Sequence, residues 1–466
     1  MYKKQHIHFV GIGGIGMSGL AHVLLTLGYR VTGSDLRSTD ITRALERQGG
    51  VIYRGHEPQY VLGADVVVIS SAIRDDNPEV EAARFAHIPV IPRAEMLAEL
   101  MRLKKFGIAV AGAHGKTSTT SMVASVLTHA DFDPTVIIGG KLNGMGGSNA
   151  YWGSGEFLVA EADESDGSFL RLTPSIAVVT NIDREHLDHY GDFENVKTAF
   201  HKFINSVPFY GVSILCTDDP LLAEMATNSS KRITTYGTDS FADLQARNIK
   251  YEGTGVVFDV WCSDGELGYI RLPAPGLHHV RNSLAAIAVG LELDIPFEVI
   301  KDGLLNYGGV GRRFDILGEV NNITVMDDYA HHPTEIQATL TAARAAWPER
   351  RLVVLFEPHR YSRTKDLMSE FPHAFREADE LWLSEIYPAS EEPIVGVTGR
   401  RLASEIRSVW GGPVHFVEQC SRLPETVVPT LRPGDVVITM GAGSIGGAGR
   451  KLIELIRHAD RSAQAV

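Results

Sequence analysis

The residues best suited to chemistry are a lysine and two hydroxyl side chains at the end of a glycine-containing turn. Gly112-Ala113-His114-Gly115-Lys116-Thr117-Ser118 follows a buried-strand pattern at 107–111 and precedes a helical pattern at 119–127. In such a turn, backbone amides surround phosphate groups, the lysine contacts the β- and γ-phosphates, and the threonine hydroxyl binds Mg²⁺. Although Val110 occupies the place of the strict motif's first glycine, we interpret the segment as an ATP-binding loop. The alternative is a chance Gly-Lys-Thr sequence in a turn.

A second glycine-rich turn, Gly11-Ile12-Gly13-Gly14-Ile15-Gly16, lies between an expected strand at 6–10 and an expected helix at 18–27. Its glycines permit a tight turn, and the amides at the start of the helix can bind a pyrophosphate. Asp35 stands at the end of the next expected strand, which begins at residue 30. The motif is compatible with a dinucleotide cofactor, with a nucleotide-diphosphate substrate and with a turn that binds nothing, and it does not distinguish among them.

Acidic side chains and histidines follow two further buried-strand patterns, at 157–160 and 176–180. The first pattern leads into Glu161-Ala162-Asp163-Glu164-Ser165-Asp166, whose carboxylates could bind Mg²⁺ together with phosphate oxygens. The second leads into a segment in which Asp183 or His186 could complete the metal site. The alternatives are a solvated acidic loop and a zinc site at His186 and His189, which the absence of a nearby cysteine disfavours.

Basic side chains occur as two pairs in the last third of the sequence. Arg360 and Arg363 follow an expected strand at 352–356 and are spaced to present two guanidinium groups to one phosphate or carboxylate. Arg312 and Arg313 could contact a phosphate in the same way. A solvated basic surface is the alternative for both pairs.

The scaffold that positions these motifs is predicted by the order of the elements. Short β-branched runs alternate with helical patterns along the chain, which predicts an α/β fold with mostly parallel sheets. The length of 466 residues is typical of about three domains. A helical pattern at 94–105 and the glycine-rich linker candidate at 307–311 indicate the boundaries. We predict domains at 1–105, 106–311 and 312–466.

Composition limits the class of partner. With 44 Lys+Arg against 57 Asp+Glu, the net charge is −13, which argues against binding to nucleic acid. Cys216, Cys262 and Cys420 lie far apart, so we expect no disulfide framework and a location in the reducing cytoplasm. Glycines and histidines interrupt the apolar stretch at 7–27, so no membrane insertion is expected.

Taken in order along essentially the whole chain, the motifs resemble those of the Mur ligases, the ATP-dependent enzymes that add amino acids to the peptidoglycan precursor. The resemblance is carried by the His-Gly-Lys-Thr loop, the strand end at Glu161, the segment 181–186 and the sequence Asp-Asp-Tyr-Ala-His-His-Pro at 327–333. It implies a Rossmann-like N-terminal domain for UDP, a central P-loop ATPase-type domain, and a Rossmann-like C-terminal domain for the amino acid. The segments 8–19 and 357–364 narrow the implied substrates to UDP-N-acetylmuramate, L-alanine and ATP. We expect a monomer or a weak homodimer.

The resemblance also implies the roles of single residues. The implied catalytic residues are Lys116, His186, Arg313, His331, Arg360 and Arg363. The implied ATP site comprises Gly112, Ala113, His114, Gly115, Lys116, Thr117, Ser118, His278, Asn282 and Asp328. The implied UDP-substrate site comprises Gly11, Gly13, Gly14, Gly16, Asp35, Ser70 and Ser71. Thr117 and Glu161 would bind one Mg²⁺ and His186 a second.

Two positions depart from the family pattern. His279 stands where asparagine is usual, and His201 stands where other members carry a carbamylated lysine, with Lys202 next to it. We therefore predict that the two Mg²⁺ ions are held without a carbamate. Three other functions are weighed against this one: a recycling ligase that attaches a preformed peptide to the same sugar nucleotide, an NAD-dependent oxidoreductase, and a non-catalytic nucleotide-binding switch.

Overall fold

The structure is a computed structural model that describes residues 5–70, 72–140, 148–238, 241–389 and 391–464. It is an α/β protein, and the described residues form three sheets. They group into two compact units. Unit 1 comprises Met1–Ile249, Phe258–Arg271 and Val280–Gly308, and unit 2 comprises Lys250–Val257, Leu272–His279 and Gly309–Val466. The last change of unit therefore falls within the glycine-rich linker expected at 307–311.

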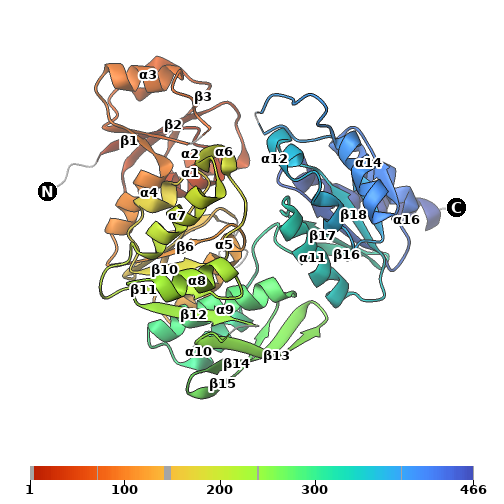
Figure 1. The fold of residues 1–466 in the computed structure, drawn as a ribbon. Helices are drawn as coiled ribbons and strands as arrows, with labels where there is room; N and C mark the ends of the chain where they lie inside the picture. Colours follow the sequence, from red (N-terminus) through yellow and green to blue (C-terminus); the bar gives the residue numbers. More distant parts are fainter. Residues whose placement is uncertain (1–4, 71, 141–147, 239–240, 390, 465–466) are drawn as a thin grey trace. The chain divides into compact units, whose positions relative to one another are not determined.

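Unit 1 begins with a five-stranded sheet in the order β3-β2-β1-β4-β5, in which all neighbours are parallel. Its central strand β1 (His6–Val10) is buried along its whole length, as expected for a parallel strand covered on both faces. The strand order reverses at β1, so the carboxyl end of this strand is where a doubly wound sheet binds ligands. The other elements are β2 (Arg30–Asp35), β3 (Val51–Arg54), β4 (Val66–Ile69), β5 (Val90–Pro92), α1 (Ile15–Thr26), α2 (Asp40–Arg47), α3 (Pro78–Phe85) and α4 (Arg93–Arg102) (Figure 1).

The second sheet has ten strands in the order β15-β14-β13-β12-β11-β10-β6-β9-β7-β8. Its strand β6 (Phe106–Ala111) lies between β9 (Phe157–Glu161) and β10 (Ile176–Val179), parallel to both. The segments that follow these three strands therefore meet at one edge. The other elements are α5 (Lys116–His129), β7 (Thr135–Ile137), β8 (Ala150–Tyr151), α6 (Leu187–Tyr190), α7 (Phe193–Ile204), β11 (Val212–Cys216), α8 (Pro220–Asn228), β12 (Ile233–Gly237), β13 (Leu244–Glu252), β14 (Gly255–Cys262), β15 (Gly265–Leu272), α9 (Leu277–Glu292) and α10 (Phe297–Leu305).

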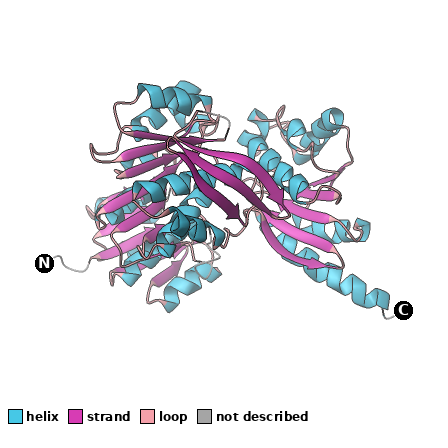
Figure 2. Ribbon diagram, turned by 90° about the horizontal axis from the view of Figure 1, so that it is seen from below, coloured by secondary structure: helices cyan, strands magenta, loops and turns pink. Residues whose placement is uncertain are grey.

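The third sheet, in unit 2, has the order β16-β17-β21-β18-β19-β20 and is parallel except for the β16–β17 pair. Alternate residues of β18 (Leu352–Phe356) belong to two different hydrophobic clusters, so helices cover both faces (Figure 2). The other elements are β16 (Asp315–Val320), β17 (Ile323–Asp328), α11 (Pro333–Ala346), α12 (Tyr361–Asp366), α13 (Phe371–Ala374), β19 (Glu380–Leu383), α14 (Gly399–Trp410), β20 (Val414–Phe416), α15 (Leu423–Val427), β21 (Val436–Met440) and α16 (Ala448–Gln464).

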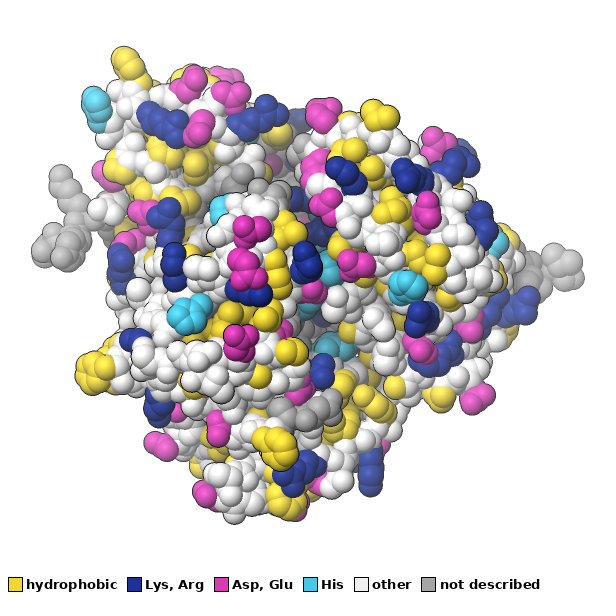
Figure 3. Space-filling model, viewed as in Figure 1, with side chains coloured by type: hydrophobic (Ala, Val, Ile, Leu, Met, Phe, Trp, Pro, Cys, Tyr) yellow, Lys and Arg dark blue, Asp and Glu magenta, His cyan; other side chains and the backbone are white. Residues whose placement is uncertain are grey.

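The surface carries charges of both signs. On the face drawn in Figure 3, Lys and Arg side chains are interspersed with Asp and Glu side chains, and the residues described there form no continuous basic area. In the described part of the chain, every helix is too short or too polar to cross a membrane.

Candidate active site

The second glycine loop joins β6 to α5 and has the backbone geometry of a phosphate-binding turn. Gly112 has a φ of +135° and Gly115 a φ of +84°, values that favour glycine. A Cβ atom on Gly112 would lie 2.0 Å from Oγ1 of Thr180, and one on Gly115 would lie 2.7 Å from Oδ1 of Asn282. Because both glycines are pressed against neighbouring elements, the loop is held in one shape.

Lys116, the first residue of α5, folds back over this loop. Its Nζ donates to the carbonyl oxygens of Gly112 at 2.6 Å and Ala113 at 3.0 Å, and to Oε1 of Glu164 at 2.8 Å. Burial alone would lower the pKa of this ammonium, but the charges of Glu164 and Glu161 outweigh burial and raise the pKa of Lys116 above its usual value. The lysine is therefore a permanent cation beside the loop.

Glu161 ends β9 and contacts the residue after the lysine. The hydroxyl of Thr117 donates to both carboxylate oxygens of Glu161, at 3.0 and 3.1 Å, and the amide of Gly139 donates to Oε2 at 2.7 Å. The structure thus brings together the threonine and the carboxylate that the sequence assigns to one metal ion. A hydroxyl and a carboxylate are oxygen ligands of the kind that Mg²⁺ prefers.

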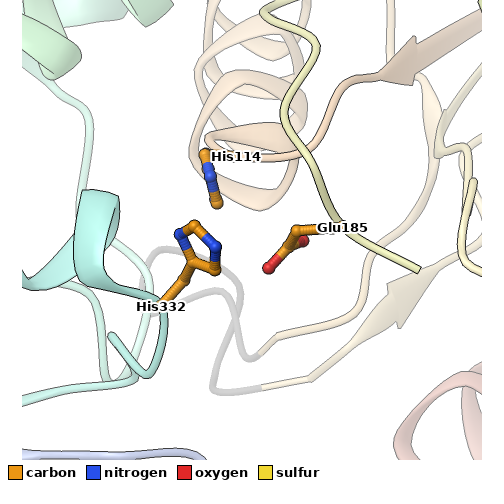
Figure 4. A group of neighbouring side chains, drawn as sticks. All are labelled: His114, Glu185 and His332. Carbon is orange, nitrogen blue, oxygen red and sulfur yellow. The ribbon is translucent and has the colours of Figure 1, made fainter. Parts of the chain in front are cut away.

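The segment after β10 supports the loop from the other side. Asn181 forms two hydrogen bonds with the backbone of His114, each of 2.9 Å. Its Oδ1 accepts from the amide of His114, and its Nδ2 donates to the carbonyl oxygen of His114. The hydroxyl of Thr180 donates to the same carbonyl at 2.6 Å, and Nε2 of His114 pairs with Oδ2 of Asp183 at 2.9 Å. Figure 4 shows His114 on the loop before α5 and Glu185 on the segment after β10, with ligand atoms within 4.8 Å of each other. His332, also labelled there, belongs to unit 2.

A group of metal-binding type lies next to Lys116. One ligand atom each of Glu164, Glu185 and His186 falls within 4.8 Å of the others. His186 adopts a left-handed conformation, with a φ of +58°, directly before α6. Burial raises the pKa of Glu164 to about 7 against the opposing effect of Lys116. Oε2 of Glu164 is buried without a hydrogen-bond partner among the described residues. These two carboxylates and the imidazole are therefore suitable ligands for a hard divalent cation.

The first glycine loop joins β1 to α1. Gly11 has a φ of +81°, and the amides of Gly11 and Ile12 donate to the carbonyl oxygen of Ser34 at 2.9 and 3.0 Å. Oδ2 of Asp35 accepts from the amide of Gly13 at 2.9 Å. Asp35 thus shapes the loop in addition to any contact that it makes with a ligand. Ser70 follows β4, and its hydroxyl oxygen would lie 3.4 Å from a Cβ on Gly11. Ser71 lies outside the described residues.

His278 and Asn282, which the resemblance assigns to the ATP site, lie in the first turns of α9. This helix begins at Leu277. Asn282 is buried against Gly115, as noted above, one turn after His278 on the same helix. His279 is buried, and its Nδ1 lies 2.6 Å from the carbonyl oxygen of Pro275. Burial lowers the pKa of His279 to about 4, so the ring is neutral and donates this hydrogen bond.

In unit 2, Asp328 and the arginine pair surround the end of β17. The two oxygens of Asp328 accept from the amides of Phe314 and Ala330, each at 2.8 Å, and burial raises its pKa to about 6. Arg312 is held by Asp327, which its Nε contacts at 2.8 Å. Arg313 extends over the ring of Tyr329 and lies 3.6 Å from Glu335. Both arginines lie over Tyr329, but Arg312 also donates to Asp327 and to the carbonyl oxygen of Gly441, whereas Arg313 has a longer contact with Glu335.

A cluster of histidines and arginines follows β18. Nη1 of Arg363 lies 3.4 Å from Nδ1 of His359, and the rings of His331 and His359 are 5.7 Å apart. His359 also stacks on Tyr387 with the planes 7° apart. Burial, and then the neighbouring positive charges, lower the pKa of His359 to about 3. Arg360 has a φ of +72° and a side chain that is 40 % exposed. The structure brings His331, Arg360 and Arg363 together and adds a neutral imidazole.

Four residues in or near these sites were not assigned a role from the sequence. Glu164 and Glu185 are in quoted motifs, but nothing in the motif singles them out from their acidic neighbours. His359 stands in the segment 357–364, and its position three residues after the buried strand β18 is the signal that could have identified it. The fourth, Arg93, lies in no motif, and only the folded chain brings its Nη2 to 2.8 Å from Oδ2 of Asp163 in the acidic segment 161–166.

Comparison with known proteins agrees with this geometry. Residues 6–105 match the model described as "Mur ligase family, catalytic domain", residues 110–290 match "Mur ligase middle domain", and residues 312–443 match "Mur ligase, glutamate ligase domain". The fold and the site thus define an ATP-dependent ligase of three domains, and the chain belongs to the Mur ligase family.

Individual relatives narrow the comparison within the family. A curated protein of Geobacter sulfurreducens named UDP-N-acetylmuramate–L-alanine ligase is 55% identical over 461 residues, which cover 98% of this chain and 99% of the relative. The crystal structure of the Thermotoga maritima protein described as UDP-N-acetylmuramate–alanine ligase aligns with a TM-score of 0.85 at 30% identity, covering 98% of this chain and 100% of that one. A murein peptide ligase from Psychrobacter arcticus aligns with a TM-score of 0.73 at 26% identity, covering 97% and 98%.

Proposed function

We propose that this chain uses ATP to join L-alanine to the lactyl carboxylate of UDP-N-acetylmuramate, releasing ADP and phosphate, in the synthesis of the peptidoglycan precursor. The observation that carries the proposal is the arrangement of Lys116, Thr117 and Glu161 around the second glycine loop, in a chain 55% identical over nearly its whole length to a ligase of that name. Family membership supports the nucleotide-diphosphate alternative for the first glycine loop over the dinucleotide cofactor, and we assign this loop to the UDP part of the substrate.

The reaction needs ATP because an amine does not attack a carboxylate near neutral pH. The lactyl carboxylate attacks the γ-phosphate in line, which gives an acyl phosphate and ADP. The amine of L-alanine then attacks the acyl carbon through a tetrahedral intermediate, and phosphate leaves. There is little covalent chemistry for the protein to perform, so positioning and charge stabilisation dominate.

The residues around the second loop supply the charge stabilisation. The amides of the loop and the ammonium of Lys116 face the phosphates, and Glu164 keeps that ammonium in place until ATP binds. Mg²⁺, when bound, would neutralise phosphate charge, with Thr117 and Glu161 as ligands of one ion and His186 of a second. Glu164 and Glu185 complete the second group, where Glu164 has a buried oxygen without a hydrogen-bond partner among the described residues.

We assign Arg313, His331, Arg360 and Arg363 to the handling of the amino acid and the acyl phosphate, and we retain domain boundaries at 105 and 311. His278, Asn282 and Asp328 are assigned to the nucleoside of ATP. We assign the enzyme to the cytoplasm, where ATP is available. A monomer or a weak homodimer stays a prediction.

The test is phosphate release from ATP in the presence of UDP-N-acetylmuramate and one acceptor at a time. L-alanine should support turnover, with glycine and L-serine as single-residue competitors. The tripeptide that a recycling ligase attaches should give no turnover above the rate without acceptor. Turnover with the tripeptide and not with L-alanine would contradict the proposal and favour the recycling ligase.

A further inference from the structure

Arg93 lies beside the first glycine loop of unit 1 and contacts the acidic segment that follows β9. It is the first residue of α4, directly after β5, and therefore stands at the same carboxyl edge of the first sheet as the loop Gly11–Gly16. Nη2 of Arg93 donates to Oδ2 of Asp163 at 2.8 Å. A Cβ atom on Gly16 would lie 3.1 Å from Nη1 and 3.3 Å from Nε of the same guanidinium. The side chain is 23% exposed, so most of it is packed against these neighbours.

The first glycine loop needs a cation from elsewhere in the fold. Its own residues, Gly11–Gly16, include no basic side chain, and one of its amides is taken by Asp35. The amides in the first turn of α1 have no carbonyl within the helix to bond, and this turn contains no acidic side chain. A guanidinium has five N–H donors in a planar fork. With one arm on Asp163, the arm beside Gly16 is placed where a diphosphate would lie.

Asp163 belongs to the segment that contacts Lys116. Its neighbour Glu164 accepts from Nζ of Lys116, and Glu161, two residues earlier, accepts from Thr117. Although burial alone would raise the pKa of Asp163, the charge of Arg93 and the hydrogen bonds to Ser165 lower it, so Asp163 is ionised near neutral pH. Arg93 beside Gly16 is thus linked to the ATP loop through its hydrogen bond to Asp163, the peptide bond from Asp163 to Glu164, and the bond from Lys116 to Glu164.

We propose that Arg93 couples the two substrates. It binds the diphosphate of the sugar nucleotide at Gly16 while holding Asp163, so that occupation of the first loop raises the affinity of the second loop for ATP. The inference rests on the assignment of the UDP part of the substrate to the first loop. Coupling of two binding sites is reciprocal, so ATP must raise the affinity for the sugar nucleotide by the same factor.

The experiment measures that factor by calorimetry. A non-hydrolysable ATP analogue with Mg²⁺ is titrated into the full-length protein with and without saturating UDP-N-acetylmuramate, and the titration is then repeated in the reverse order. Wild type should bind the analogue about tenfold more tightly with the sugar nucleotide present, within the usual range of coupling. In Arg93→Met the factor should fall below about twofold in both directions. The affinity for the analogue alone should change less than threefold.

Two further variants separate coupling from structure. Arg102→Met removes a 62% exposed arginine from the last turn of the same helix and should keep the wild-type factor. Asp163→Asn should lose the coupling. Both Asp163→Asn and Arg93→Met should bind the sugar nucleotide alone more weakly than wild type, and the loss should be smaller in Asp163→Asn. Unchanged coupling in Arg93→Met, or no coupling in a wild type that ligates L-alanine, would overturn the inference. A wild type that ligates no single amino acid would instead overturn the proposed function.

Discussion

The two glycine loops of unit 1 occupy equivalent places in their sheets and have different sources of positive charge. Each follows a buried central strand, contains a first glycine with a positive φ (Gly11 at +81° and Gly112 at +135°), and leads into a helix. The second loop ends at Lys116, whose ammonium lies over its own carbonyls. The first loop has no basic residue, and the guanidinium that lies beside its Gly16 comes from α4.

This difference follows from what each loop must do. A phosphate that is transferred gains negative charge at the reacting oxygens, so a fixed cation in the loop stabilises the transition state. A diphosphate that is only bound needs neutralisation that need not change during the reaction. Its cation can therefore come from another element, as with Arg93 of α4. Binding of the diphosphate can then affect the residues that this element contacts. Substitutions in each loop test whether the second loop serves phosphate transfer and the first loop serves only substrate binding.

The largest effect is expected for the cation of the second loop. Lys116→Ala should lower kcat by roughly 10³-fold, because it removes a fixed charge beside the transferred phosphate. Binding of UDP-N-acetylmuramate, measured by calorimetry, should stay within twofold of wild type. Lys105→Ala is the matched control, since this lysine is 60% exposed. Equal loss of ligation and of sugar-nucleotide binding would contradict the division between the loops.

The carboxylate beside the second loop should be almost as important. Glu161→Ala should cost roughly 10³-fold in kcat through loss of a metal ligand, and raising the Mg²⁺ concentration should recover part of the activity. Lys202→Ala is the contrasting variant. Its side chain is exposed on α7, so the variant should keep most activity. If Lys202→Ala is inactive and a short-chain carboxylate restores it, the site uses a carbamate and the prediction from His201 is wrong.

A moderate effect is expected at the first loop. Asp35→Ala removes the acceptor of the Gly13 amide and should weaken binding of UDP-N-acetylmuramate about tenfold, in line with the loss of a charge-assisted hydrogen bond. Asp35→Asn retains an acceptor oxygen and removes a negative charge near the diphosphate, so it should bind at least as tightly as wild type. Binding of the ATP analogue alone should be unchanged in both. A weaker Asp35→Asn would show that the charge itself contacts the substrate.

The sequence predicts the second loop better than its surroundings. Lys116, Thr117 and the strand end at Glu161 were predicted because a phosphate loop is contiguous in the chain and buried parallel strands are apolar runs. The strands β13 to β15 were not predicted. β13, for example, is largely exposed beyond its first residues and carries many polar side chains. Arg93 was not predicted, because its partner Asp163 is 70 residues away in sequence and only the packing of two sheets brings them together.

The smallest effect on catalysis is expected at His279, where the chain departs from its family. His279→Asn should leave kcat near wild type at pH 7.5 if the ring serves α9 and not the nucleotide. The stability should respond to pH instead. Burial lowers the pKa of His279 to about 4, while an unfolded histidine has its ordinary value of 6.5. The unfolded chain therefore takes up a proton first as the pH falls, so the stabilisation is complete above pH 6.5 and is lost progressively towards pH 4.

At pH 5 this linkage amounts to about 2 kcal/mol, from roughly 1.4 kcal/mol for each unit of pH below 6.5. Chemical denaturation at pH 7.5 and pH 5 should show that wild type loses about that much more stability on acidification than His279→Asn does. The variant should be less stable at pH 7.5, because the bond from Nδ1 to Pro275 is lost or lengthened. The same acid sensitivity in both proteins would mean that the ring is protonated in the folded state. His279 would then carry a charge next to Arg313, and the role of a neutral ring that anchors the start of α9 would be wrong.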